Sequence, residues 1–140
     1  MGAGTVAQAG SALEDMGGFG TALRQARAAE AAHLEAVRSL SSAASLRLQV
    51  LKEELAGIVA VSPEAREAFE LALAPGDSPR LWIDLNTSVV MEPDPKTYRL
   101  VQQGGGSLDV VLETTDRAAM VQQVKLIMAH GMIGRRRRAG

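Results

Sequence analysis

Apolar residues in the first half of the chain follow a seven-residue pattern. Between residues 21 and 61 there is no proline and one glycine, and strong helix formers dominate. This composition predicts one long helix, with Thr21 as its N-cap. Alternating steps of three and four residues define a heptad row, which is typical of a coiled coil. The row consists of Leu34, Val37, Ser41, Ala44, Leu48, Leu51, Leu55 and Ile58.

A second, shorter helix is predicted after Val61. Ser62 is a suitable N-cap, Pro63 fits the first helical position, and Pro75-Gly76 is a termination signal. The helix is therefore expected over residues 63–74. Its buried stripe is predicted to consist of Ala65, Ala68, Phe69 and Ala72.

Beyond Pro79 the apolar period changes to two, which predicts strands. Leu81, Ile83 and Leu85 fall on one face of the first strand, and Trp82 falls on the other. Three more strands are expected over residues 88–92, 97–102 and 108–114. The connections at 93–95 and 103–107 are short, the first stiff and the second flexible, so the strands should form an antiparallel meander.

A final helix should begin at a cap formed by Thr115 or Asp116, run to about His130 and end before Gly131. Its apolar face should cover one side of the sheet and consists of Met120, Val121, Val124, Ile127 and Met128.

The expected fold class is therefore α+β. It combines a long coiled-coil-like N-terminal helix, a short second helix, a three- or four-stranded antiparallel meander and a C-terminal helix packed on the sheet. We expect a flexible arm over residues 1–20, the heptad helix over 21–61, a small α+β head over 62–134 and a basic tail over 135–140.

The length of the first helix predicts a partner. Forty-one residues at about 1.5 Å each span about 60 Å, roughly twice the diameter of the small head. An overhanging apolar row needs a cover, most simply the same row of a second copy. The alternative is a bend at the cluster of Ser39, Ser41, Ser42 and Ser45, which would fold the helix into a hairpin within one chain. The residues expected to mediate self-association in a homodimer are Leu34, Val37, Ala44, Leu48, Leu51, Leu55 and Ile58.

Composition narrows the class of protein. Ala is abundant and Arg outnumbers Lys, as in proteins from GC-rich bacterial genomes. No cysteine is present, which excludes thiolate chemistry and favours the reducing cytoplasm. The longest apolar run, residues 55–61, is about a third of the length of a membrane span, so no transmembrane segment is expected.

Charge is distributed unevenly along the chain. Residues 1–116 carry nine basic and all sixteen acidic side chains, a formal charge of −7, whereas residues 117–140 carry six basic and no acidic side chains, +6. The run Arg135, Arg136, Arg137 and Arg138 is therefore the candidate contact for an anionic partner: an acidic protein, nucleic acid or an anionic membrane surface. A solvated tail is the ordinary alternative.

No arrangement of residues predicts catalysis. The two histidines, His33 and His130, lie in different helices without a nucleophile and acid spaced as in a triad. The carboxylates near the strands match no calcium loop; they are Asp84, Glu92, Asp94 and Asp109. The glycine run at 104–106 lacks the Lys-Ser/Thr of a phosphate-binding loop. No catalytic, cofactor-binding or metal-binding residue is therefore predicted.

Trp82 has two readings. It could anchor an interaction surface, or one of the first two helices could cover it.

The preferred hypothesis for function is a non-enzymatic, homo-oligomeric scaffold or adaptor that self-associates through its heptad helix. The alternative is a small nucleic-acid-associated regulatory protein that uses the arginine cluster.

Overall fold

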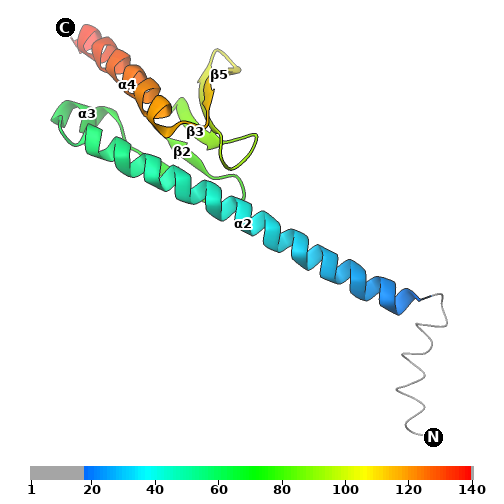
Figure 1. The fold of residues 1–140 in the computed structure, drawn as a ribbon. Helices are drawn as coiled ribbons and strands as arrows, with labels where there is room; N and C mark the ends of the chain where they lie inside the picture. Colours follow the sequence, from blue (N-terminus) through cyan, green and yellow to red (C-terminus); the bar gives the residue numbers. More distant parts are fainter. Residues whose placement is uncertain (1–17, 140) are drawn as a thin grey trace, which may run out of the picture. The chain divides into compact units, whose positions relative to one another are not determined.

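The computed structural model describes residues 18–139 and confirms the α+β class (Figure 1). The chain divides into two units, the first ending at Arg38 and the second beginning at Ser39. The helices and strands are α2 (Phe19–Val59), α3 (Pro63–Ala68), β1 (Ala72–Ala74), β2 (Arg80–Trp82), β3 (Thr87–Met91), β4 (Tyr98–Gly104), β5 (Ser107–Thr114) and α4 (Arg117–Ala139). Most of the arm predicted over 1–20 lies outside the described residues.

The predicted long helix is confirmed as α2. It begins at Phe19, so the assignment of Thr21 as N-cap is wrong; the Thr21 hydroxyl instead accepts a hydrogen bond from Arg24 Nη2 at 3.2 Å. The helix is continuous through the serine cluster, which contradicts the alternative of a helical hairpin. Serine costs little in a helix when its side chain finds a partner, and the Ser41 hydroxyl donates to the Gly76 carbonyl oxygen at 2.6 Å.

The second helix is shorter than predicted. Ser62 is its N-cap as expected, and its hydroxyl accepts a hydrogen bond from the Ala65 amide at 3.2 Å. The helix stops at Ala68 because Phe69 takes an extended backbone (φ −127°, ψ 115°) that leaves its ring buried in the core. The prediction of a helix to residue 74 is therefore wrong: residues 72–74 form the edge strand β1, which pairs with β2, and Ala72 is exposed rather than buried.

The described residues form a five-stranded antiparallel sheet in the order β1-β2-β3-β4-β5, one or two strands more than expected. The strand β2 ends at Trp82, and a bend over residues 83–86 follows. In this bend Ile83 N donates to Thr87 O at 2.9 Å, and Leu85 is turned outward with 91% of its surface exposed. Leu85 is therefore not part of the predicted core face.

The connection between β4 and β5 is tighter than the flexible loop predicted. The strands continue to Gly104 and Ser107, so only two residues form the turn. Gly105 and Gly106 both have positive φ, 58° and 82°. Two consecutive positive φ angles match the twist of a β-hairpin, and glycine adopts them without strain.

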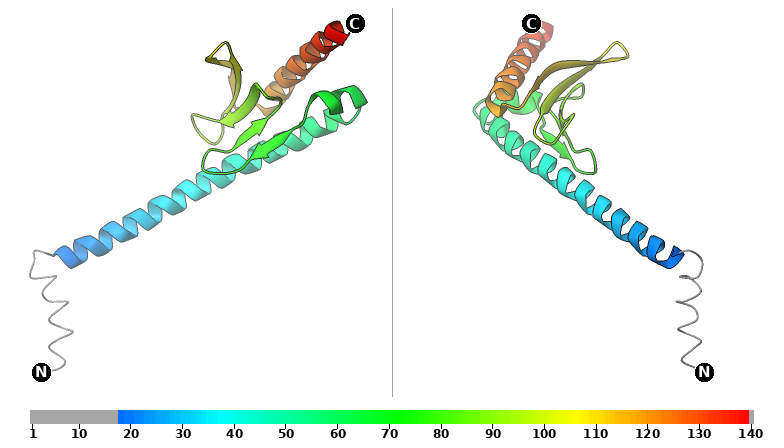
Figure 2. Two further views of the ribbon diagram at one scale, coloured as in Figure 1. Left: turned by 180° about the vertical axis from the view of Figure 1, so that it is seen from behind. Right: turned by 45° about the vertical axis from the view of Figure 1, so that its right-hand side comes forward.

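One face of the sheet carries the core. Paired positions on successive strands form an apolar row across all five: Leu73, Leu81, Val89, Leu100 and Leu112. The part of α2 in the second unit and α4 lie on this same side of the sheet (Figure 2). The predicted face of α4 is confirmed, because Met120, Val121, Val124 and Met128 are buried in that core and Ile127 packs against it.

The last helix begins at a cap and continues past its predicted end. The Asp116 carboxylate accepts a hydrogen bond from the Ala118 amide at 2.9 Å, in agreement with the predicted cap. Gly131 does not adopt the positive φ of a terminating glycine, and α4 runs to Ala139. The four arginines therefore lie on the last turns of a helix rather than on a separate tail. The helix dipole stabilises positive charge at this end of a helix.

Candidate functional site

The second half of the heptad row lies in the core of a single chain. Ala44, Leu48, Leu51 and Leu55 are buried with the sheet and α4, and Ile58 packs against the same cluster. The chain therefore covers these side chains itself, which removes the premise that they need a second copy. Whether they mediate self-association stays a prediction. Upstream, Leu34 is 49% exposed and Val37 is half-buried.

A different row of α2 is exposed. Leu46 is 65% exposed and lies on the helix face opposite to Leu48 and Leu51, and Val50, 37% exposed, lies one helical turn beyond Leu46. Val50 belongs to a set of small or apolar residues that recur every seven positions along α2. All six residues of this set are exposed: Ala22, Ala29, Ala36, Ala43, Val50 and Gly57. We call these six residues together with Leu46 the outer row. Sequence reasoning missed it because the larger side chains of the heptad row dominate the pattern, although the spacing is visible in the sequence.

A groove of about 580 Å³ lies beside Trp82. We call it the Trp82 groove, and its lining residues are Glu67, Ala68, Glu70, Ala72, Trp82, Asp84 and Leu85. The indole is half-buried, and the guanidinium of Arg80 lies 5.3 Å from the centre of its ring. Ala68, at the end of α3, lines the same groove, so the predicted helix cover is only partial. The role of Trp82 as an anchor of an interaction surface stays a prediction.

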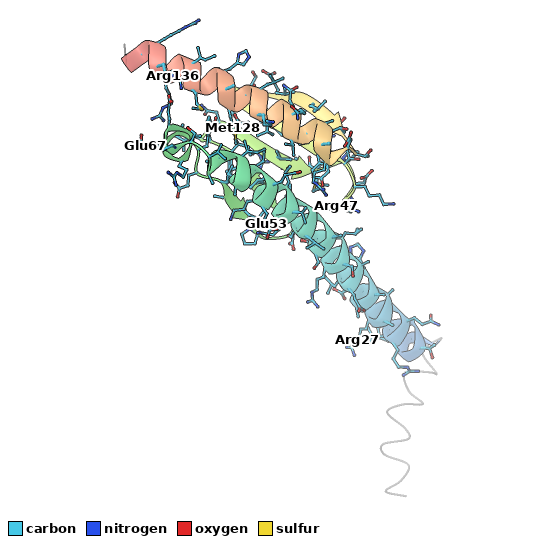
Figure 3. The ribbon with its side chains drawn as sticks, turned by 60° about the vertical axis from the view of Figure 1, so that its left-hand side comes forward. Arg27, Arg47, Glu53, Glu67, Met128 and Arg136 are labelled. Atoms are coloured by element: carbon cyan, nitrogen blue, oxygen red, sulfur yellow. The ribbon has the colours of Figure 1, made fainter. Side chains whose placement is uncertain are left out.

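The arginine cluster is only partly available to a partner. Arg136 Nε and Nη2 donate to the two carboxylate oxygens of Glu64 at 3.0 and 2.7 Å. These hydrogen bonds hold the pKa of Glu64 below its ordinary value of 4.5. Figure 3 shows the last turns of α4, where Arg136 is labelled, next to α3. Arg135, Arg137 and Arg138 are exposed and make no ion pair with any residue in the range 18–139.

The carboxylates near the strands serve local structure. Asp84 Oδ1 accepts from the Asn86 amide at 2.8 Å, and Asp94 Oδ1 accepts from the Lys96 amide at 2.8 Å and the Thr97 hydroxyl at 3.0 Å. The bond from the Lys96 amide is the main cause that lowers the pKa of Asp94. These bonds stabilise the bend after β2 and the turn after β3.

Glu92 and Glu113 both pair with Arg99 across the outer face of the sheet, while Asp109 is exposed on the edge strand β5. Over residues 18–139, no three His, Cys, Asp or Glu side chains come together as a possible metal site.

The histidines are separated in the fold. His33 is exposed on the first unit's part of α2. His130 is exposed on α4 and lines a groove of about 570 Å³ together with Asp84 and Gln102. No hydrogen bond joins His130 to Asp84 in the described structure. The groove therefore does not present an assembled pair of acid and base.

No helix in the described part of the chain combines the length and apolar character of a membrane span. No protein-family model, no curated protein and no solved structure matches the chain. The fold and its surfaces are therefore the basis on which a function is inferred.

Proposed function

We propose that the chain is a non-enzymatic scaffold or adaptor that self-associates through the outer row of α2. The carrying observation is the exposure of Leu46 and Val50 within a row that repeats every seven residues. A seven-residue apolar repeat keeps the same face of one helix against another over a long distance. A second copy offers the identical row, so the contact closes under two-fold symmetry.

The small side chains of the outer row support this proposal. Alanine and glycine let two helix backbones approach closely, and Leu46 and Val50 add apolar surface. Few charges interrupt the row: the positions three residues after its alanines are Gln25, Ala32, Ser39 and Leu46, and Glu53 is the charged residue at the next one. Complete burial of a fully exposed leucine or valine contributes about 1.5–3 kcal/mol, and Leu46 and Val50, 65% and 37% exposed, would each contribute the corresponding fraction of that amount.

Light scattering of the purified protein at low micromolar concentration tests the proposal. We expect the wild type to have twice the chain mass of 14.7 kDa. The double variant Leu46→Glu, Val50→Glu should have the mass of one chain, because two charges would be buried without partners.

The matched control is Ala31→Glu, Ala56→Glu, which adds the same charge at exposed positions of α2 outside the outer row. This control should keep the wild-type mass. A monomeric wild type, or a control that dissociates as completely as the test variant, contradicts the proposal.

A further inference from the structure

The Trp82 groove is lined by both apolar and acidic side chains. Trp82 and Leu85 supply apolar surface, and Leu85 is almost fully exposed. Glu67, Glu70 and Asp84 supply carboxylates, and the described residues that line the groove include no lysine or arginine. Arg80 lies against the indole and donates to the Ser88 hydroxyl at 2.7 Å.

Two of these carboxylates are free within the described structure. No hydrogen bond or ion pair to Glu67 or Glu70 occurs among residues 18–139. Both side chains lie at the surface. They are therefore available to a cation from outside the subunit, whereas Asp84 already accepts from the Asn86 amide.

The chain itself carries a segment of complementary chemistry. We define the basic segment as residues 132–138, which places Met132 and Ile133 directly before four arginines. Ile133 is 48% exposed. Within one subunit Arg136 already binds a carboxylate of α3, Glu64, one turn before Glu67. The exposed Arg135, Arg137 and Arg138 form no such pair with the part of their own subunit that the structure describes.

We propose that the Trp82 groove binds the basic segment of a second copy of the chain. In this contact, arginines meet Glu67 and Glu70, and Ile133 meets the apolar surface at Leu85. Guanidinium groups bind carboxylates through paired hydrogen bonds and also stack on indole rings. The inference rests on the proposed self-association. It adds a contact between opposite charges to the apolar contact between two outer rows.

Charge complementarity is the reason for choosing a second copy as the occupant. The chain separates −7 over residues 1–116 from +6 over residues 117–140, so two copies attract when the end of one meets the body of the other. A two-fold arrangement lets each copy give one basic segment and receive one. Nucleic acid and lipid headgroups would be repelled by the carboxylates of the groove.

Tryptophan fluorescence of the full chain tests the proposal, because Trp82 is the only tryptophan. The probe is a synthetic peptide of residues 132–140, Met-Ile-Gly-Arg-Arg-Arg-Arg-Ala-Gly. We expect a saturable change in emission that weakens as salt is raised. The same peptide with glutamine in place of the four arginines should give no change.

Two matched variants locate the site. Glu67→Gln, Glu70→Gln should bind the peptide about fivefold more weakly, since each exposed ion pair contributes roughly 0.5 kcal/mol. Glu30→Gln, Glu35→Gln removes the same charge from exposed positions of α2 and should leave binding unchanged. Equal affinity of the two double variants, or the absence of any emission change, overturns the proposal.

Two further outcomes separate the alternatives. A peptide of the same composition in scrambled order that binds as tightly would overturn the assignment to the chain's own segment and indicate a groove for basic peptides in general. A monomeric wild type that binds the peptide contradicts both the outer-row contact and the docking of a second copy in the groove, and it leaves the groove as a site for a basic peptide of another protein. A dimeric wild type that does not bind the peptide contradicts the groove proposal alone.

Discussion

The two parts of α2 have similar composition but different surroundings. In residues 39–59 the heptad row is buried, with Leu48, Leu51 and Leu55 fully enclosed by the sheet and α4. In residues 19–38 no large apolar side chain is buried in the described structure, and Leu34 remains about half exposed. Apolar residues with the same heptad spacing are thus buried in the core in residues 39–59 and exposed at the surface in residues 19–38.

The difference shows what a heptad pattern does and does not specify. The spacing fixes which side chains share a helix face. The element that covers the face depends on the rest of the chain, and here five strands present an apolar row that fits residues 44–58. Residues 19–38 depend on the helix propensity of alanine, glutamate and arginine, or on another chain.

The largest expected effect separates the two parts directly. Leu51→Ala should lower the free energy of unfolding by about 3 kcal/mol, because it removes a fully buried side chain and leaves a cavity. Leu34→Ala should change it by less than about 0.5 kcal/mol, since the leucine is half exposed and alanine is the better helix former. Urea unfolding followed by circular dichroism measures both. If Leu34→Ala lowered the free energy of unfolding as much as Leu51→Ala, the two parts of α2 would not differ in burial, and Leu34 would be covered in solution.

The sequence specified the fold well where one pattern dominated. The long helix, the four main strands and the buried face of α4 were all predicted from periodicity. The short strand β1 was missed because Ala-Leu-Ala has no strand preference of its own and is held by its pairing with β2. The end of α4 was misplaced because Gly131 resembles a C-cap, yet it lies within the helix beside the ring of Phe69.

The surfaces were harder to predict than the fold. The Trp82 groove is built from α3, β1 and the bend after β2, so no single stretch of sequence displays it. The pairing of Arg136 with Glu64 joins residues that are 72 positions apart. The heptad row was recognised, but its cover was assigned to a second chain because the sequence does not state which face of the sheet packs on it. Charges placed at Leu48 and Leu55 would therefore disrupt folding rather than assembly alone.

A smaller effect sharpens the comparison where the two parts of α2 meet. Ser41→Ala removes the hydrogen bond to the Gly76 carbonyl, whereas Ser42→Ala removes an exposed hydroxyl on the next residue. Both changes improve helix propensity equally, so the difference between them reports the hydrogen bond. We expect Ser41→Ala to be less stable than Ser42→Ala by about 0.5–1 kcal/mol in urea unfolding. Identical stabilities would show that α2 is not held to the loop at Gly76.

The smallest expected effect concerns the ion pair between α3 and α4 in the second unit. Hydrogen bonds from Arg136 lower the pKa of Glu64 in the folded chain, so the pair stabilises the fold above the ordinary value of 4.5 and is lost as the pH falls through the lowered pKa. The difference in urea midpoint between the wild type and Glu64→Gln should be constant well above pH 4.5 and should shrink as the pH falls through the lowered pKa of Glu64. The urea midpoints of Arg136→Gln and of the double variant Arg136→Gln, Glu64→Gln should differ by the same amount at every pH, because the partner of Glu64 is already absent from both. A pH-dependent difference that persists in the Arg136→Gln background would assign it to another neighbour of Glu64 rather than to this contact between α3 and α4.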